Sequence, residues 1–182
     1  MQQALIYVQR QELALCLALS RLQQLRLPRH LFVAASRLGD GALWYALMAG
    51  LLLFQGLPAA PAVAQMAATG TIATGLYALL KRQTRRVRPY EADPALIPAT
   101  PALDRYSFPS GHTLHAVVFT TLAIAHYPAL APWLIPVAAL IGASRVVLGL
   151  HYPSDVLAGA LLGAVLAQIS LALPLDLALA SH

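Results

Sequence analysis

Five long stretches of this sequence carry almost no charge, and they restrict the possible folds more than any other feature. They are residues 41–57, 61–80, 113–127, 132–150 and 156–173. A helix needs about 20 apolar residues to cross a hydrocarbon core of about 30 Å, so several stretches must borrow residues from their flanks. We therefore expect an all-α integral membrane bundle of about five transmembrane helices joined mostly by short turns.

The composition agrees with a membrane protein. Hydrophobic residues make up 59% of the 182 residues and charged residues only 10%, against about 45–50% and about 25% in soluble domains. The net charge of +5 comes from basic residues that flank the apolar stretches. This favours a role at a membrane face or in phosphate binding, and no nucleic-acid partner is expected.

Residues 1–40 differ from the rest and are predicted to form an amphipathic amino-terminal segment, followed by a transmembrane domain over residues 41–182. Leucines recur at helical spacing over residues 11–27, but Arg21 and Arg26 interrupt them. Each arginine at the centre of a span would cost about 2.5–3.5 kcal/mol. We therefore expect an interfacial helix on the lipid headgroups, ended by Pro28.

Three short blocks of polar residues lie at the ends of the apolar stretches. They are Lys81-x6-Arg88-Pro89, Pro109-Ser110-Gly111-His112 and Ser144-Arg145-x5-His151-x3-Asp155. The first two flank the only long connection, residues 81–109, and a loop of that size is usually functional or disordered. If successive spans alternate in direction, all three blocks meet on one face of the membrane.

The first block supplies cations. In a continuous helix Lys81 and Arg88 would lie two turns apart on one face, about 10 Å along the axis, with Arg85 between them and Pro89 ending the helix. Two cations at this spacing suit a phosphoryl group. The alternative is a basic flank that anchors the span to lipid headgroups.

The second block predicts the start of a helix. Ser110 can cap it, and Gly111 lets backbone amides approach an anion closely. His112 would then face the same pocket. The alternative is an ordinary cap followed by an interfacial histidine.

The third block carries the most specific signal. Arg145 is costly in so apolar a stretch and therefore needs a function or a partner. The four-residue spacing of His151 and Asp155 lets a carboxylate hold an imidazole, which fixes the tautomer and leaves the other ring nitrogen free to attack. The alternative is a structural aspartate cap, with Pro153 in the first turn of the last helix.

Together the blocks resemble the signature of the type 2 phosphatidic acid phosphatase superfamily, which also includes bacterial acid phosphatases and vanadium haloperoxidases. All eleven specified positions match, within residues 81–155. The resemblance implies a phosphohistidine mechanism with His151 as nucleophile, Asp155 orienting it and His112 as general acid. It also implies a set of residues that hold the phosphoryl oxygens: Lys81, Arg88, Ser110, Gly111 and Arg145.

The resemblance further implies a hydrolase of lipid phosphates that needs no metal or other cofactor. The sequence has seven acidic residues and no dense ligand cluster near the blocks. Phosphatidate, phosphatidylglycerol phosphate and undecaprenyl diphosphate all present a suitable terminal phosphoryl group. Two alternatives stay open: a phosphotransferase that passes the group to another lipid, and a non-catalytic phospholipid-binding membrane protein.

The side of the membrane is predicted differently by two arguments. In a five-span arrangement the face with the three blocks carries the lysines and arginines, so the positive-inside rule assigns it to the cytoplasm. The resemblance implies a bacterial inner-membrane protein, and many such relatives act on the periplasmic face. The sequence does not indicate an oligomeric state.

Three further features carry smaller predictions. Gly159 and Gly163 should allow close helix packing inside the bundle. His115, one turn beyond His112, is interpreted as a polar residue of the bundle interior, with a place on the pocket wall as the alternative. Asp40 is predicted to cap the first transmembrane helix, with a contact to a cation of the site as the alternative.

Overall fold

The chain is all-α throughout residues 2–173, the part that the computed structural model describes. The helices are α1 Gln2–Ser20, α2 Arg26–Leu38, α3 Ala42–Gln55, α4 Ala60–Thr84, α5 Pro89–Ala92, α6 Gly111–His126, α7 Ala131–Val147 and α8 Pro153–Ala172, with 3-10 turns at Arg21–Gln24, Leu57–Ala59 and Pro128–Leu130. All five apolar stretches form helices, as the sequence predicts.

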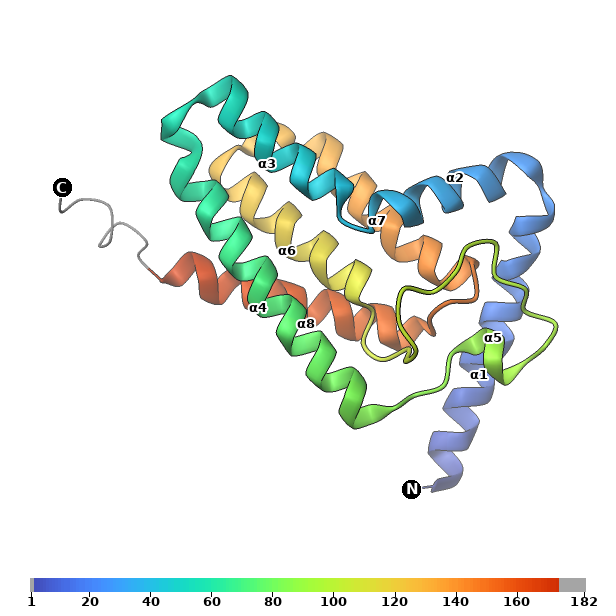
Figure 1. The fold of residues 1–182 in the computed structure, drawn as a ribbon. Helices are drawn as coiled ribbons and strands as arrows, with labels where there is room; N and C mark the ends of the chain where they lie inside the picture. Colours follow the sequence, from blue (N-terminus) through green and yellow to red (C-terminus); the bar gives the residue numbers. More distant parts are fainter. Residues whose placement is uncertain (1, 174–182) are drawn as a thin grey trace.

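Helix α6 lies at the centre of the bundle. It packs against α4, α7 and α8, and α3 runs along the outside of the same group (Figure 1). Leu114, Val118 and Leu122 of α6 are fully buried in this core. The site described below is built at the amino-terminal end of α6, so its position is set by the best-packed helix of the molecule.

Helices α6 and α8 approach closely because α8 presents glycines to α6. A Cβ atom at Gly159 would lie 2.5 Å from the carbonyl oxygen of Ser110, and one at Gly163 would lie 2.6 Å from that of Leu114. Both distances are too short for a side chain. The prediction that these glycines serve helix packing inside the bundle is confirmed.

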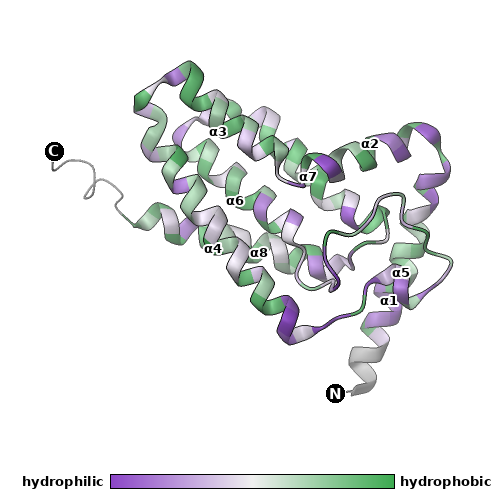
Figure 2. Cartoon of the chain, viewed as in Figure 1, coloured by the Kyte–Doolittle hydropathy of each residue, from purple (hydrophilic) through white to green (hydrophobic). Residues whose placement is uncertain are grey.

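In the part of the chain that the structure describes, three helical segments are long and apolar enough to cross a membrane: Leu57–Ala92, Pro128–Val147 and Pro153–Ala172. Helices α2 and α3 form a fourth candidate span, bent by 60° between them. Hydrophobic residues cover most of the bundle, whereas hydrophilic residues gather at the end where α1, α2 and α5 lie (Figure 2). The count of five spans stays a prediction.

The amino-terminal segment differs from the prediction at Pro28, which does not end a helix. Helix α1 stops at Ser20, and Pro28 lies in the first turn of α2. Proline is tolerated there because the amides of a first turn have no acceptor within the helix. Both α1 and α2 pack against α7. The interfacial position of this segment and the domain boundary after residue 40 stay predictions, and residues 174–182 of the predicted domain lie outside the described residues.

Candidate active site

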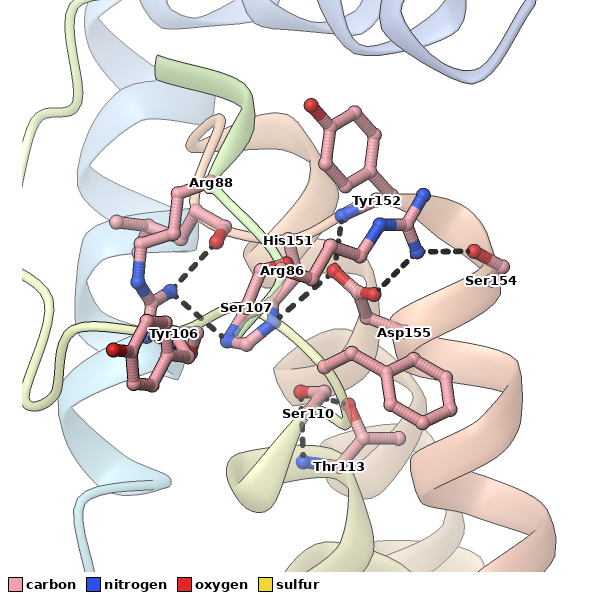
Figure 3. Close-up of polar contacts among 12 residues, drawn as sticks. Arg86, Arg88, Tyr106, Ser107, Ser110, Thr113, His151, Tyr152, Ser154 and Asp155 are labelled. Carbon is pink, nitrogen blue, oxygen red and sulfur yellow. Dashed lines mark hydrogen bonds and ion pairs between the residues drawn. The ribbon is translucent and has the colours of Figure 1, made fainter. Parts of the chain in front are cut away.

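The three blocks meet at one end of the bundle, although up to 74 positions separate their first and last residues. The first and third are joined by Arg88, whose Nη1 lies 3.2 Å from Nε2 of His151 (Figure 3). The second and third are joined by the amide of Ser110, which donates to the carbonyl oxygen of Asp155 at 3.0 Å. Figure 3 shows Arg88 and Asp155 on opposite sides of the His151 ring.

The first block is not one continuous helix, so the predicted helical spacing of its cations is wrong. Helix α4 ends at Thr84, Arg85 takes a left-handed conformation with φ of 48°, and Arg88 is extended. Pro89 begins α5 rather than ending a helix, because its ring disfavours helical backbone at the preceding residue and suits a first helical position. Arg85 is exposed, away from the buried Lys81 and Arg88.

A carboxylate that the sequence did not single out joins these two cations. Oδ1 of Asp104 accepts from Nζ of Lys81 at 2.8 Å and from Nη2 of Arg88 at 2.7 Å. Both cations also donate to the carbonyl oxygen of Tyr106. Asp104 lies in the long connection, where no motif marks it. Buried cations need a counter-charge, and Asp104 supplies it here.

The contact between Arg88 and His151 fixes the tautomer of the imidazole. A guanidinium can only donate, so Nε2 of His151 must accept and its proton must sit on Nδ1. Nδ1 faces Oδ2 of Asp155 at 3.5 Å but makes no hydrogen bond with it. The lone pair is therefore on Nε2, the nitrogen that points away from the carboxylate.

His151 is held in a tight turn and shielded from water. His151 is 1% exposed, and its backbone amide donates to the carbonyl oxygen of Arg145 at 3.0 Å. Gly149 allows the turn because it adopts a φ of +68°. Burial lowers the pKa of His151 well below its ordinary value, and the charges of Arg88 and Arg145 lower it further. The imidazole is therefore neutral, the form that a nucleophile requires.

Asp155 is fully buried in the first turn of α8 and has three partners. Its Oδ2 accepts from the amide of Tyr152 at 2.8 Å, in addition to facing His151. Its Oδ1 accepts from Nη1 of Arg86 at 2.6 Å. Asp155 therefore serves the helix start and also faces the histidine, while its role in orienting His151 stays a prediction. Arg86, two residues before Arg88, was not predicted.

The second block starts α6, as predicted. Ser110 is the N-cap and its Oγ accepts from the amide of Thr113 at 3.4 Å. Gly111 and His112 form the first helical positions, and Nε2 of His112 lies 2.6 Å from Oδ1 of Asp40. The predicted capping role of Asp40 is wrong: Gly41 precedes α3, and no side chain caps that helix. The bend between α2 and α3 brings the carboxylate to His112 instead.

Arg145, in the last turn of α7, is buried beside α2. Its Nη1 donates to Oγ of Ser36. Its Nε is buried and has no hydrogen-bond partner among the described residues. Ser144 turns back on its own helix, where its Oγ donates to the carbonyl oxygen of Ile141 at 2.6 Å.

A cavity of about 660 Å³ opens between α3, α4 and α6. Polar residues line the end near the three blocks: Asp40, Lys81, Asp104, Gly111 and His112. Apolar and aromatic residues line the rest, among them Trp44, Met48, Ala67 and Phe119. His115 also lies on the wall, with Nδ1 3.1 Å from the carbonyl oxygen of Gly111. The alternative reading of His115 as a pocket residue is therefore correct.

The nucleophile candidate is not on the cavity wall. His151, Arg88 and Arg145 are buried and do not line the cavity, whereas Lys81 and Asp104 do, and Asp104 contacts Arg88. Among residues 2–173, no three His, Cys, Asp or Glu side chains are grouped so that they could hold a metal ion. The site is therefore a set of fixed cations, two histidines and their carboxylates at the closed end of a mainly apolar cavity.

Comparison with known proteins matches the model of the PAP2 superfamily to residues 61–177. The chain is 44% identical over 85 residues to a decaprenylphosphoryl-5-phosphoribose phosphatase of Mycolicibacterium smegmatis, covering 44% of this chain and 43% of that protein. It is 37% identical over 100 residues to a lipid A 1-phosphatase of Rhizobium etli, covering 52% and 43%. These matches span less than half the length of the two relatives.

Two solved structures resemble nearly the whole chain. The transmembrane phosphatidylglycerolphosphate phosphatase of Bacillus subtilis superposes with a TM-score of 0.71 at 26% identity, covering 91% of this chain and 85% of that one. LpxE of Aquifex aeolicus superposes with a TM-score of 0.64 at 27% identity, covering 86% and 93%. With its three membrane-length helices, the chain is an integral membrane protein.

Proposed function

This chain belongs to the PAP2 superfamily, and from that premise we propose that it is a membrane phosphatase that removes the terminal phosphate of a lipid phosphate or lipid diphosphate. The observation that carries the proposal is the state of His151. It is a buried, neutral imidazole with its lone pair on Nε2, between Arg88 and Asp155. Such an imidazole is prepared to attack phosphorus.

In the proposed first step Nε2 of His151 attacks the terminal phosphorus and the bond from phosphorus to the leaving oxygen breaks. His112 gives its proton to that oxygen, so the lipid leaves as an alcohol or as a lipid phosphate. Asp155 stabilises the positive charge that develops on the imidazole. The product on the protein is a phosphohistidine.

In the second step water attacks the phosphohistidine. His112 takes a proton from the water, the bond between phosphorus and Nε2 breaks, and inorganic phosphate leaves. The charge on the phosphoryl oxygens is stabilised in both steps by fixed donors. These are Lys81, Arg88, Arg145, Ser110 and the amide of Gly111. No metal takes part.

Access to His151 requires two exchanges of partners, because Nη1 of Arg88 must also release Nε2 of His151 before that nitrogen can attack. The carboxylate of Asp104 forms ion pairs with Lys81 and Arg88, and the Asp104 side chain is 39% exposed. We propose that phosphoryl oxygens replace this carboxylate on the two cations. The loop that carries Asp104 then moves aside while the substrate is bound.

The cavity favours a lipid as substrate. Its apolar walls extend from His112 to Trp44, Met48 and Phe119, which suits an acyl or prenyl chain attached to the leaving oxygen. The relatives named above are described as acting on a decaprenylphosphoryl sugar phosphate, lipid A and phosphatidylglycerol phosphate. We propose a substrate of the phosphatidate, phosphatidylglycerol phosphate or undecaprenyl diphosphate type.

The test is release of inorganic phosphate by the purified protein in detergent, from a panel of these lipids with EDTA present. Wild-type protein should release phosphate from at least one lipid, and His151→Ala should release none. A ³²P-labelled substrate should leave acid-labile, base-stable label on the wild-type protein and not on the variant. Equal release by both proteins would overturn the mechanism.

The same assay separates the alternatives. Label that moves from the donor lipid to a second lipid, without release of phosphate, would identify a phosphotransferase. Lipid binding without release or transfer would identify a binding protein. Either result would replace the hydrolase.

We propose the bacterial inner membrane as the location, with the active site on the periplasmic face as in many relatives. The excess of basic residues on that face is then explained partly by catalysis. Protease treatment of spheroplasts should cleave a tag placed before residue 1, because helix α1 lies at the same end of the molecule as the site. Cleavage only after membrane disruption would assign the site to the cytoplasm.

A further inference from the structure

One residue of α1 reaches the site from far outside the three blocks. Glu12 is largely buried, with 12% of its side chain exposed. Its Oε2 accepts from Nη2 of Arg86 at 2.7 Å. Its Oε1 accepts from the amide of Ser154 at 2.7 Å. A single carboxylate of the amino-terminal segment thus contacts both the first block and the start of α8.

The contact with Ser154 fixes the beginning of α8. Ser154 is the second residue of that helix and Asp155 the third. The amides of a first turn lack partners within the helix, and a negative charge there is favourable. Burial alone would raise the pKa of Glu12, but the bonds from Ser154 and Arg86 hold it below its ordinary value. Glu12 is therefore an ionised cap supplied by another helix.

Arg86 connects this cap to the catalytic carboxylate. Its Nη1 donates to Oδ1 of Asp155 at 2.6 Å and to Oγ of Ser154 at 2.7 Å. Its guanidinium also lies over the ring of Tyr152, 4.1 Å from the centroid. A planar guanidinium that is stacked and bonded on both sides has little freedom to rotate. Because Arg86 is fixed, its hydrogen bond also restricts the position of the Asp155 carboxylate.

The charges of the three groups explain why two carboxylates are present. Arg86 paired with Asp155 alone would neutralise the carboxylate that faces His151. Because Glu12 shares Arg86, the trio of Glu12, Arg86 and Asp155 keeps a net charge of −1. That charge remains to stabilise the positive imidazole ring of a phosphohistidine.

We propose that Glu12 and Arg86 are positioning residues: they hold Asp155 in place behind His151 and preserve its negative charge, so that α1 contributes to catalysis. This inference rests on the proposed function. It gives the amino-terminal segment a role in turnover, in addition to any contact with the membrane surface. Neither residue touches the substrate; both act through Asp155.

The test compares kcat and KM for Glu12→Gln, Arg86→Gln and the double variant. Glutamine at position 12 still accepts from Ser154 but carries no charge, so kcat should fall about tenfold with KM within about twofold of wild type. Arg86→Gln should lower kcat further. Since both act through one carboxylate, the double variant should be no slower than Arg86→Gln alone.

Glu91→Gln is the matched control, because Glu91 is exposed on α5 and its variant should match wild type. If Glu12→Gln does not give folded protein, Glu12→Asp keeps the charge, shortens the reach and should still lower kcat at constant KM. An unchanged kcat, a change in KM alone, or a loss of kcat in the double variant equal to the product of the single losses would overturn the positioning role of Glu12 and Arg86. Absence of phosphate release from the wild type would overturn the proposed function, and this positioning role with it.

Discussion

The two histidines of the site lie in contrasting surroundings. His151 and its neighbours Asp155 and Arg88 are almost fully buried, and bonds from three directions hold them in place. His112 is also buried, at 9% exposed, but it lines the cavity, and its partner Asp40 has 41% of its side chain exposed. We call the surroundings of His151 the closed half of the site, and the part that borders the cavity the open half.

The difference follows the division of labour in the proposed reaction. A nucleophile gains most from a fixed geometry, because a misplacement of about 1 Å costs about a hundredfold in rate. A general acid must meet a leaving lipid and then a water molecule, so it needs an accessible surface. Damage to the closed half should therefore affect every substrate, whereas damage to the open half should depend on the leaving group.

The largest effect is expected from Asp155→Asn. The amide cannot stabilise a positive imidazole, so kcat should fall about 10³–10⁴-fold while KM changes little. The loss should be the same for a lipid phosphate and for p-nitrophenyl phosphate, measured by steady-state phosphate release. Thermal unfolding in detergent is the control for folding. A loss below about tenfold would show that His151 does not depend on this carboxylate.

His112→Gln should separate the two halves. With a lipid phosphate kcat/KM, which reports only the steps up to the phosphohistidine, should fall about 10²–10³-fold, since the leaving alkoxide needs a proton. With p-nitrophenyl phosphate, whose leaving group needs none, the loss should be about tenfold or less. Equal losses on both substrates would remove the acid role from His112 and with it the contrast between the halves.

Asp40→Asn tests the partner of the acid. Asparagine keeps the contact with Nε2 of His112 but removes the charge, so kcat/KM on a lipid phosphate should fall about fivefold to tenfold. The loss should again shrink on p-nitrophenyl phosphate. Asp93→Asn is the matched control, because asparagine can still accept from the amide of Ala95 as Asp93 does. An Asp40 variant indistinguishable from it would contradict the pairing.

The smallest effect is expected from acidification. Burial and the nearby arginines lower the pKa of His151, so the imidazole stays neutral as the pH falls past its ordinary value of 6.5. The kcat should therefore not decline between about pH 7.5 and about pH 5.5. A decline in kcat at low pH with a midpoint near 6.5 would show that His151 is more exposed to water than the structure indicates.

The sequence predicted the parts of this molecule that depend on helix count and composition. Alternation of apolar helices was enough to bring Arg88, Ser110 and His151 to one end of the bundle. The preferences of single residues were enough to identify the cap at Ser110 and the glycine contact at Gly159. These features follow from local preferences and from the direction of successive helices.

The partners of those residues could not be read from the sequence. Spacing along an ideal helix favoured Arg85, but the chain leaves the helix at that residue and Arg86 reaches Asp155 instead. Asp104 and Glu12 carry no motif, and Asp40 was predicted to be a helix cap. Their contacts depend on the path of a long loop, the packing of α1 and the bend after α2. Such contacts arise from tertiary structure alone.

The bridge that Asp104 makes between Lys81 and Arg88 bears on the end of the catalytic cycle. Inorganic phosphate, the final product, carries the same charges as the group that was transferred and would otherwise linger on the two cations. A carboxylate tethered to the neighbouring loop competes for them at a high effective concentration, since it cannot diffuse away. In the proposed reaction the loop would thus help to expel the product, and we expect Asp104→Asn to be inhibited by added phosphate more strongly than the wild type.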